Sequence, residues 1–150
     1  MRMYIAGSWV DREEKIEVIH PYDGSIIDTV PKASAEDVDK AIEAAERGAI
    51  AMAAMTGYER YEILTRAAAL MEERIEDLGR TVTREEGKVL SEGILEATRA
   101  CETIVVSAEE AKRISGEALP MDGASNGAGK FGFTLRVPCG VVVAITPFNF

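Results

Sequence analysis

A run of five apolar residues near the end of the sequence, Val141 to Ile145, constrains the fold more than any other feature. A strand formed by this run has no polar face, so both of its faces must be buried. Strands of that kind lie at the centre of parallel sheets, where helices cover both sides. Pro138-Cys139-Gly140 before the run and Thr146-Pro147 after it are typical of turns. The run therefore predicts a central parallel strand and an α/β fold.

The preceding residues change from strand-like to helix-like patterning at Ser34. Short strands are predicted at residues 3–5, 9–10, 16–19 and 25–30, with a turn at 21–24. After Ser34, apolar residues recur every three or four positions, which is the period of an amphipathic helix. Helices are predicted from Ser34 to about residue 49, from Thr56 to Leu78, at 80–86 and at 91–114. In this interpretation Gly79 separates the second helix from the third, and Gly87 ends the third.

A glycine-rich loop over residues 122–130 precedes another predicted strand, Phe131 to Val137, in which residue types alternate. Within this region, the segment from Gly127 to Gly132 matches the spacing G-x-G-x-x-G. In dinucleotide-binding proteins that motif leaves a strand and opens a helix, whereas here a loop precedes it and a strand follows. A P-loop is excluded as well, because Phe131 stands where Ser or Thr would ligate magnesium. We therefore interpret these glycines as loop residues.

The composition is that of a soluble globular protein, with 47% hydrophobic and 29% charged residues, so a packed core is expected. The net charge is −9 and no Lys/Arg block offsets it, which disfavours nucleic acid as a partner. No apolar run is long enough to cross a membrane, and the first residues lack a signal-peptide pattern. We expect a cytoplasmic protein without membrane contact.

The two cysteines and the single histidine give no basis for a metal site, because Cys101, Cys139 and His20 are far apart in the sequence. Cys101 falls on the inward face of its predicted helix and is expected in the core. The methionines on the helix faces are interpreted as core residues rather than as a ligand-binding surface. They are Met52, Met55 and Met71.

Five stretches along the chain resemble segments of the aldehyde dehydrogenase superfamily, and they occur in the family's order. They are Ala6–Val10, His20–Gly24, Glu85–Lys88, Ala108–Lys112 with Gly116-Glu117, and Arg136–Phe150. The resemblance implies an α/β, aldehyde dehydrogenase-like fold. In it, residues 1–150 are the N-terminal part of a Rossmann-type NAD(P)-binding domain, with residues 124–139 as a β arm for oligomerisation. The catalytic domain is then expected outside this sequence.

The same resemblance implies an enzyme that oxidises a small aldehyde to its carboxylic acid, with NAD or NADP, through a cysteine thioester. Asn149 matches the family's asparagine that holds the oxyanion, and a neutral amide donor suits developing negative charge. The cofactor side of the site would be lined by Ile145, Thr146, Pro147 and Phe148. Asn149 also follows a predicted strand closely, where ligands bind in open α/β sheets.

Several properties of the complete protein follow from the resemblance. The family nucleophile lies much further along the chain than this sequence reaches, so Cys139 is interpreted as structural and the 150 residues alone as inactive. A homo-oligomer, either a dimer or a tetramer, is expected. The Pro138-Cys139-Gly140 turn and Phe148 are similar to the branch that acts on lactaldehyde or glyceraldehyde 3-phosphate, and succinate semialdehyde stays an alternative substrate.

Two other classes of protein remain as alternatives. The first is a non-catalytic fragment or subunit-contact module of the same fold, for which an amide donor at Asn149 would have no use. The second is a helical ligand-binding or scaffold protein, which the amphipathic helices between Ser34 and Ile114 suggest but which leaves the apolar strand without a role. We expect this chain to be the leading portion of a longer protein, and to be prone to aggregation and poorly folded by itself.

Overall fold

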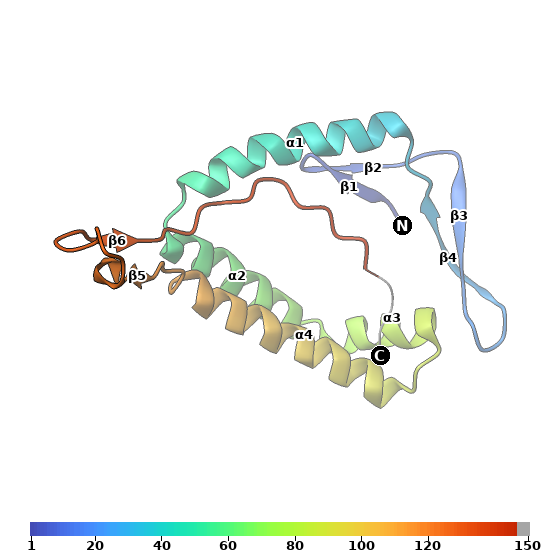
Figure 1. The fold of residues 1–150 in the computed structure, drawn as a ribbon. Helices are drawn as coiled ribbons and strands as arrows, with labels where there is room; N and C mark the ends of the chain where they lie inside the picture. The colour runs from blue at the N-terminus through green and yellow to red at the C-terminus, as the bar shows by residue number, and fades with distance from the viewer. Residues whose placement is uncertain (147–150) are drawn as a thin grey trace.

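The computed structural model describes residues 1–146, which form two helical layers bordered by small β-hairpins (Figure 1). The helices are α1 (Ala35–Ala54), α2 (Gly57–Glu72), α3 (Ile75–Glu86) and α4 (Leu90–Ala111), with a short 3-10 helix η1 (Met121–Gly123). The strands are β1 (Met3–Ile5), β2 (Ser8–Val10), β3 (Lys15–Ile19), β4 (Ile26–Pro31), β5 (Ala118–Leu119) and β6 (Gly132–Phe133). The expected mixture of helices and strands is confirmed.

The described strands pair as three antiparallel hairpins, β1–β2, β3–β4 and β5–β6. The four predicted N-terminal strands are confirmed to within one or two residues at their ends. The β1–β2 hairpin contacts α1. The turn of the β3–β4 hairpin reaches the other layer, where Pro21 packs against Gly87 at the end of α3. The small sheets therefore lie on the helices, as their limited size requires.

The beginnings of α1 and α2 are fixed by side-chain caps, as the sequence predicts. Ser34 and Asp37 form a reciprocal capping box at α1, and Thr56 and Glu59 form one at α2. In each box, the side-chain oxygen of the first residue accepts the backbone N–H three residues later, and the carboxylate accepts the N–H of the cap. At α3, Gly87 adopts the left-handed conformation that ends the helix.

The predicted helix break at Gly79 is wrong. The break falls between α2 and α3 at Glu73-Arg74, and Gly79 lies buried inside α3. A Cβ atom at Gly79 would lie 2.8 Å from the backbone nitrogen of Ile94, so glycine is required there because α4 crosses α3 closely. The sequence signal at Gly79 therefore reports helix packing rather than helix termination.

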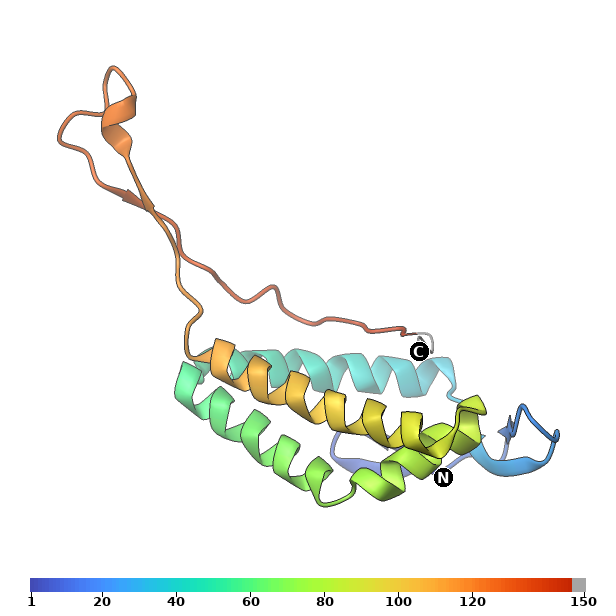
Figure 2. The same ribbon diagram turned by 90° about the horizontal axis from the view of Figure 1, so that it is seen from below.

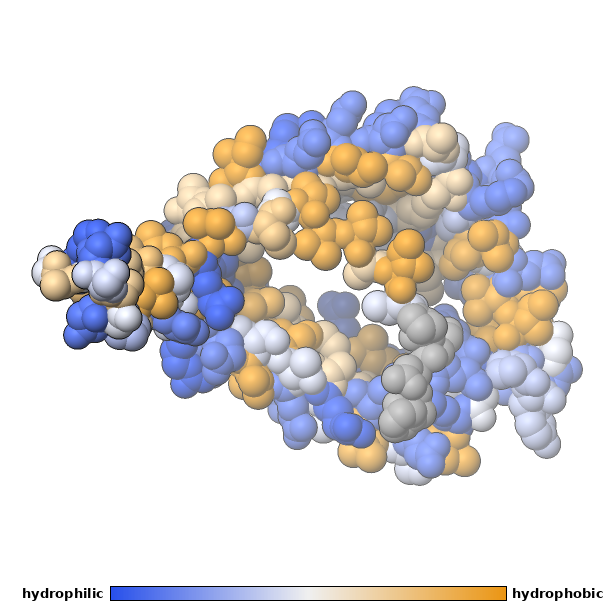
Figure 3. Space-filling model, viewed as in Figure 1, coloured by the Kyte–Doolittle hydropathy of each residue, from blue (hydrophilic) through white to orange (hydrophobic). Residues whose placement is uncertain are grey.

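The buried core lies where α2 and α3 pack against α4. Its five apolar members among the described residues are Ala68, Ala97, Cys101, Ala108 and Ala111. Cys101 is thus a core residue, as expected. The apolar face of α1 is largely uncovered, and Ile42 is 42% exposed, so the core is smaller than the composition suggests. Figure 3 shows an opening between the two helical layers, with apolar residues on its upper border.

The prediction of a buried strand at Val141–Ile145 is wrong for the structure as described. Residues 134–146 form no strand: Thr134 donates to the carbonyl oxygen of Glu117, and residues 135–146 then run unpaired along one side of the two helical layers (Figure 2). Val142 and Val143 are 73% and 72% exposed. A strand needs neighbours that supply backbone hydrogen bonds, and the described residues provide none beside residues 141–145. The predicted strand at Phe131–Val137 is likewise reduced to Gly132–Phe133.

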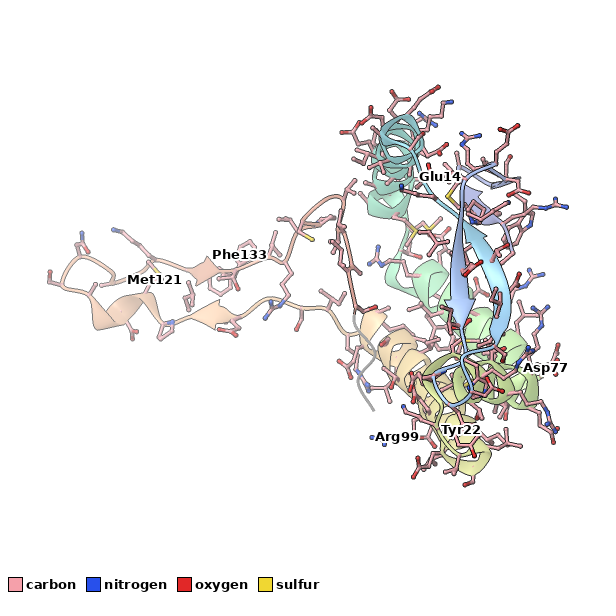
Figure 4. The ribbon with its side chains drawn as sticks, turned by 90° about the vertical axis from the view of Figure 1, so that its right-hand side faces the viewer. Glu14, Tyr22, Asp77, Arg99, Met121 and Phe133 are labelled. Atoms are coloured by element: carbon pink, nitrogen blue, oxygen red, sulfur yellow. The ribbon has the colours of Figure 1, made fainter. Side chains whose placement is uncertain are left out.

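A two-stranded arm projects away from the helical layers (Figure 2). It consists of residues 116–134 and contains β5, η1 and β6; Met121 and Phe133 lie along it (Figure 4). The G-x-G-x-x-G segment forms the loop before β6, with no helix following it. The rejection of this motif as a dinucleotide-binding loop therefore agrees with the structure.

Asp37, the one charged side chain among the described residues that is fully buried, joins the β2–β3 connection to α1. It is 2% exposed and accepts hydrogen bonds from Ser34 and from the guanidinium of Arg12, whose Nε lies 2.9 Å from Oδ2. The Arg12 hydrogen bonds, followed by those from Ser34, hold the pKa of Asp37 well below its ordinary value of 3.8. Asp37 is therefore ionised and paired at neutral pH.

We predict opposite effects for one substitution at two helical glycines. Gly48→Ala should raise the free energy of unfolding by about 0.5–1 kcal/mol, because Gly48 is exposed in α1 and a Cβ there meets nothing within 4 Å. Gly79→Ala should lower it by about 1–3 kcal/mol, because the added methyl group meets Ile94. Urea unfolding of both variants measures the difference, and equal shifts would contradict the close crossing of α3 and α4.

We also predict that Asp37→Asn lowers the melting temperature by several degrees at neutral pH. The pKa of Asp37 is lowered in the folded protein, so its contribution is complete above the ordinary carboxyl pKa and is lost as the pH falls towards the folded value. The gap between variant and parent should therefore narrow below about pH 4. Thermal melts from pH 7 to pH 3 test this, with Asp39→Asn, an exposed neighbour on α1, as the control.

Candidate functional site

The candidate active site lies at the end of the segment 134–146. Of the five residues expected to form it, the structure describes Ile145 and Thr146, whereas Pro147, Phe148 and Asn149 lie outside the described residues. Ile145 is 91% exposed and Thr146 is also exposed. These two residues can offer an apolar side chain and a hydroxyl to a ligand, which suits one wall of a cofactor site rather than a complete site.

Residues 136–140 of the same segment lie beside the corner that the C-terminal end of α1, the first turn of α2 and Ile114 form. Here a cavity of about 280 Å³ separates residues 136–140 from the ends of α1 and α4. Its lining residues are Ala49, Met52, Ala53, Arg60, Ile114, Arg136, Val137, Pro138 and Gly140. The cavity is mostly apolar, and its two charged lining groups are both guanidinium groups. The segment therefore lies beside this corner at residues 136–140 and is exposed along its whole length.

Arg60 is the polar residue at this corner that sequence reasoning missed. It lies in the first turn of α2 and is half-buried. Its Nη1 atom donates to the carbonyl oxygen of Met55 at 2.6 Å and, more weakly, to that of Met52 at 3.4 Å. No periodicity in the sequence indicates this contact, because it depends on how the chain turns between α1 and α2.

A cluster of charged residues lies at the junction of α3 and α4. Lys88 donates to Glu86 at 2.7 Å and also to Glu96, and both Lys88 and Glu86 are mostly buried. The hydrogen bond to Glu86, followed by that to Glu96, raises the pKa of Lys88 above its ordinary value. This cluster ties the end of α3 to α4, and it involves the Glu85–Lys88 stretch that the family resemblance singled out.

Cys139 lies in the turn before the apolar run and is exposed, with its thiol free. It is therefore not a core residue, unlike Cys101. The described residues contain no group of three His, Cys, Asp or Glu side chains that could hold a metal ion. Within residues 1–146, no helix combines the length and apolar character that a membrane crossing needs.

The chain matches the model of the aldehyde dehydrogenase family over residues 9–150. It is 40% identical over 147 residues to a 3-sulfolactaldehyde dehydrogenase of Priestia aryabhattai, covering 98% of this chain and 30% of that protein. It is 40% identical over 148 residues to the NADP-dependent succinate-semialdehyde dehydrogenase GabD of Escherichia coli K12, covering 97% and 30%. The crystal structure of aldehyde dehydrogenase 21 from Physcomitrella patens, in complex with succinate, superposes with a TM-score of 0.80 at 36% identity. That superposition covers 88% of this chain and 28% of the plant chain.

The helices and strands of residues 1–146 correspond to the N-terminal α/β part of the fold of these neighbours. The chain belongs to the aldehyde dehydrogenase family. It spans 30% of the length of the curated relatives named above. Among the similar proteins, NADP and NAD both occur as cofactors. The family membership predicted from the five short stretches is thereby confirmed.

Proposed function

We propose that the intact protein oxidises a small aldehyde to its carboxylic acid with NAD or NADP, through a thioester on a cysteine. The observation that carries this proposal is the family match, which continues through residue 150 and so includes the Thr146–Phe150 stretch. In this proposal, residues 1–150 are the N-terminal part of the NAD(P)-binding domain. The nucleophilic cysteine and the glutamate that activates water belong to the remainder of the protein.

Asn149 is the proposed oxyanion residue of this chain. When a thiolate attacks an aldehyde, the carbonyl oxygen gains negative charge, and a fixed amide N–H stabilises that charge more in the transition state than in the ground state. An amide has no proton to lose near neutral pH, so it donates without neutralising a thiolate. The nicotinamide cofactor, when bound, accepts the hydride.

The proposed cofactor wall consists of Ile145, Thr146, Pro147 and Phe148. The exposure of Ile145 and Thr146 supports this assignment, because residues that meet a ligand must not already be covered by the protein. The exposed Cys139 precedes the apolar run, and we assign it no part in the chemistry. The 150 residues alone are accordingly proposed to be inactive.

We further propose that the aldehyde carries an anionic group at the end opposite its carbonyl. Two similar proteins act on such compounds by name, 3-sulfolactaldehyde and succinate semialdehyde. Lactaldehyde itself, which the turn at residues 138–140 suggested, lacks this group. A sulfonate or carboxylate is bound by Arg or Lys side chains, and the residues that would do so in this protein lie in the remainder of its active site.

The projecting arm is the proposed subunit contact of a dimer or tetramer. Several large apolar side chains along it are exposed, among them Phe131 and Phe133. A two-stranded ribbon with exposed aromatic residues is unstable in isolation and gains stability by adding to another surface. The occupant that we propose is a second copy of the chain. The alternative function, a non-catalytic subunit-contact module, would use the same arm without Asn149.

Gly116→Ala should weaken subunit association, with the dissociation constant rising about tenfold or more. A Cβ at Gly116 would lie 1.6 Å from the carbonyl oxygen of Thr134, so the two sides of the arm must separate at its base. Gly123→Ala in η1 is the matched control, because a Cβ there meets nothing within 4 Å. The weight-average molar mass of the intact protein, measured by light scattering across a dilution series, tests this prediction. An unchanged mass for both variants would exclude the arm as the contact.

Asn149→Ala in the intact protein should reduce kcat about a hundred- to a thousandfold, with a smaller change in KM, because the amide acts mainly in the transition state. Asn126→Ala, in the arm loop, is the control and should leave kcat unchanged. Steady-state rates with succinate semialdehyde and with lactaldehyde measure both variants. A kcat for Asn149→Ala equal to that of the parent would remove the oxyanion assignment and favour the non-catalytic alternative.

A further inference from the structure

Arg60 occupies the point at which three parts of the chain converge. It lies in the first turn of α2, it donates to the carbonyl groups of Met52 and of the C-cap Met55 at the end of α1, and it lines the cavity beside residues 136–140. The same residue also lines the adjoining cavity, of about 390 Å³, between α2 and α4. No other basic residue of α2 lines both cavities.

The contact with α1 is electrostatically favourable. The C-terminal end of a helix has carbonyl groups without intrahelical partners and carries partial negative charge. The last turn of α1 contains no basic residue of its own. The guanidinium of Arg60 supplies the missing positive charge. Its Nη1 atom donates to the carbonyl oxygen of Met55 and, more weakly, to that of Met52, which also accepts the N–H of Met55. Arg60 therefore fixes the direction of α1 relative to α2.

The direction of α1 matters for the segment that leads to the candidate active site. Residues 136–138 and 140 face the cavity across from Ala49, Met52 and Ala53 of α1. Glu110 lines the adjoining cavity, but within residues 1–146 Arg60 forms no ion pair, so the carbonyl groups at the end of α1 are its hydrogen-bond partners. If α1 turned relative to α2, the surface under the segment would shift, and residues 141–146 would start from a different position.

We propose that Arg60 is a positioning residue for the reaction: it holds the surface beside residues 136–140, in the stretch of sequence that precedes the proposed site residues 145–149. This inference rests on the proposed function, because it assigns importance to where that segment ends. It does not require Arg60 to touch the substrate or the cofactor. A displacement on the order of 1 Å at reacting groups can lower a rate about a hundredfold, so a distant anchor can influence kcat.

The test compares Arg60→Met with two controls in the intact enzyme. Arg66→Met removes an exposed arginine from the other face of α2, and Gly79→Ala destabilises the fold at the α3–α4 crossing, away from the corner. The measurements are kcat per active site, titrated from the burst of reduced cofactor, and KM for the cofactor. Hydrogen exchange of peptides covering residues 134–146 reports the segment directly.

For Arg60→Met we expect kcat per active site to fall about tenfold and the cofactor KM to rise, with faster exchange across 134–146. Both controls should keep kcat per active site, even though Gly79→Ala lowers stability. Arg60→Lys, which keeps a single charged donor, should give an intermediate kcat and covers the case in which the methionine variant does not fold. A kcat per active site equal to that of the parent, in whichever of the two variants folds, would overturn the proposal.

Failure of this inference and failure of the proposed function can be told apart. If Asn149→Ala retains the parent kcat, the proposed function fails regardless of Arg60. If Asn149→Ala loses activity while the Arg60 variants keep theirs, only the positioning role is wrong. Loss of activity in Arg60→Met and Gly79→Ala in equal proportion would also contradict the proposal, because it would show a general effect of stability.

Discussion

Helix α4 holds the layer of α2, α3 and α4 together, because α2 and α3 both pack against its small-residue face. Gly93, Ala97 and Cys101 let the helices approach closely, and a Cβ at Gly93 would lie 2.5 Å from the carbonyl oxygen of Gly79. Close approach replaces the burial of large side chains as the source of dispersion contacts. The β3–β4 hairpin reaches this helical unit at Gly87, whereas the β1–β2 hairpin contacts α1.

Local sequence signals predicted the parts of the fold that depend on local interactions. The capping boxes at Ser34 and Thr56 and the left-handed Gly87 are decided within a few residues, so they could be recognised before the structure was known. The break assigned to Gly79 was wrong because glycine has two uses, ending a helix and admitting a neighbouring helix, and only tertiary contacts separate them. The unpaired state of residues 141–145 was also unpredictable locally, since pairing depends on other strands.

The candidate site divides in the same way. Asn149 and the residues before it were identified by resemblance, because a short motif in family order carries information that periodicity does not. Arg60 could not be identified from the sequence, since its partners are backbone carbonyl groups and any residue type supplies those. Lys88 belonged to a recognised stretch, yet its pairing with Glu96 required the crossing of α3 and α4. The contacts of Arg60 and Lys88 could not be predicted from the sequence, because both depend on how the helices are arranged in space.

The corner formed by Arg60 has a consequence for the order of folding. Arg60 and Met55 are close in the sequence. The α3–α4 contacts join consecutive helices, and the α2–α4 contacts span only α3, so these contacts close short loops at low entropic cost. Residues 136–140 can reach α1 only after the residues between them, 55–135, have been synthesised. On the ribosome, the helices can therefore pack first, and residues 136–140 can then bind to a surface that has already formed.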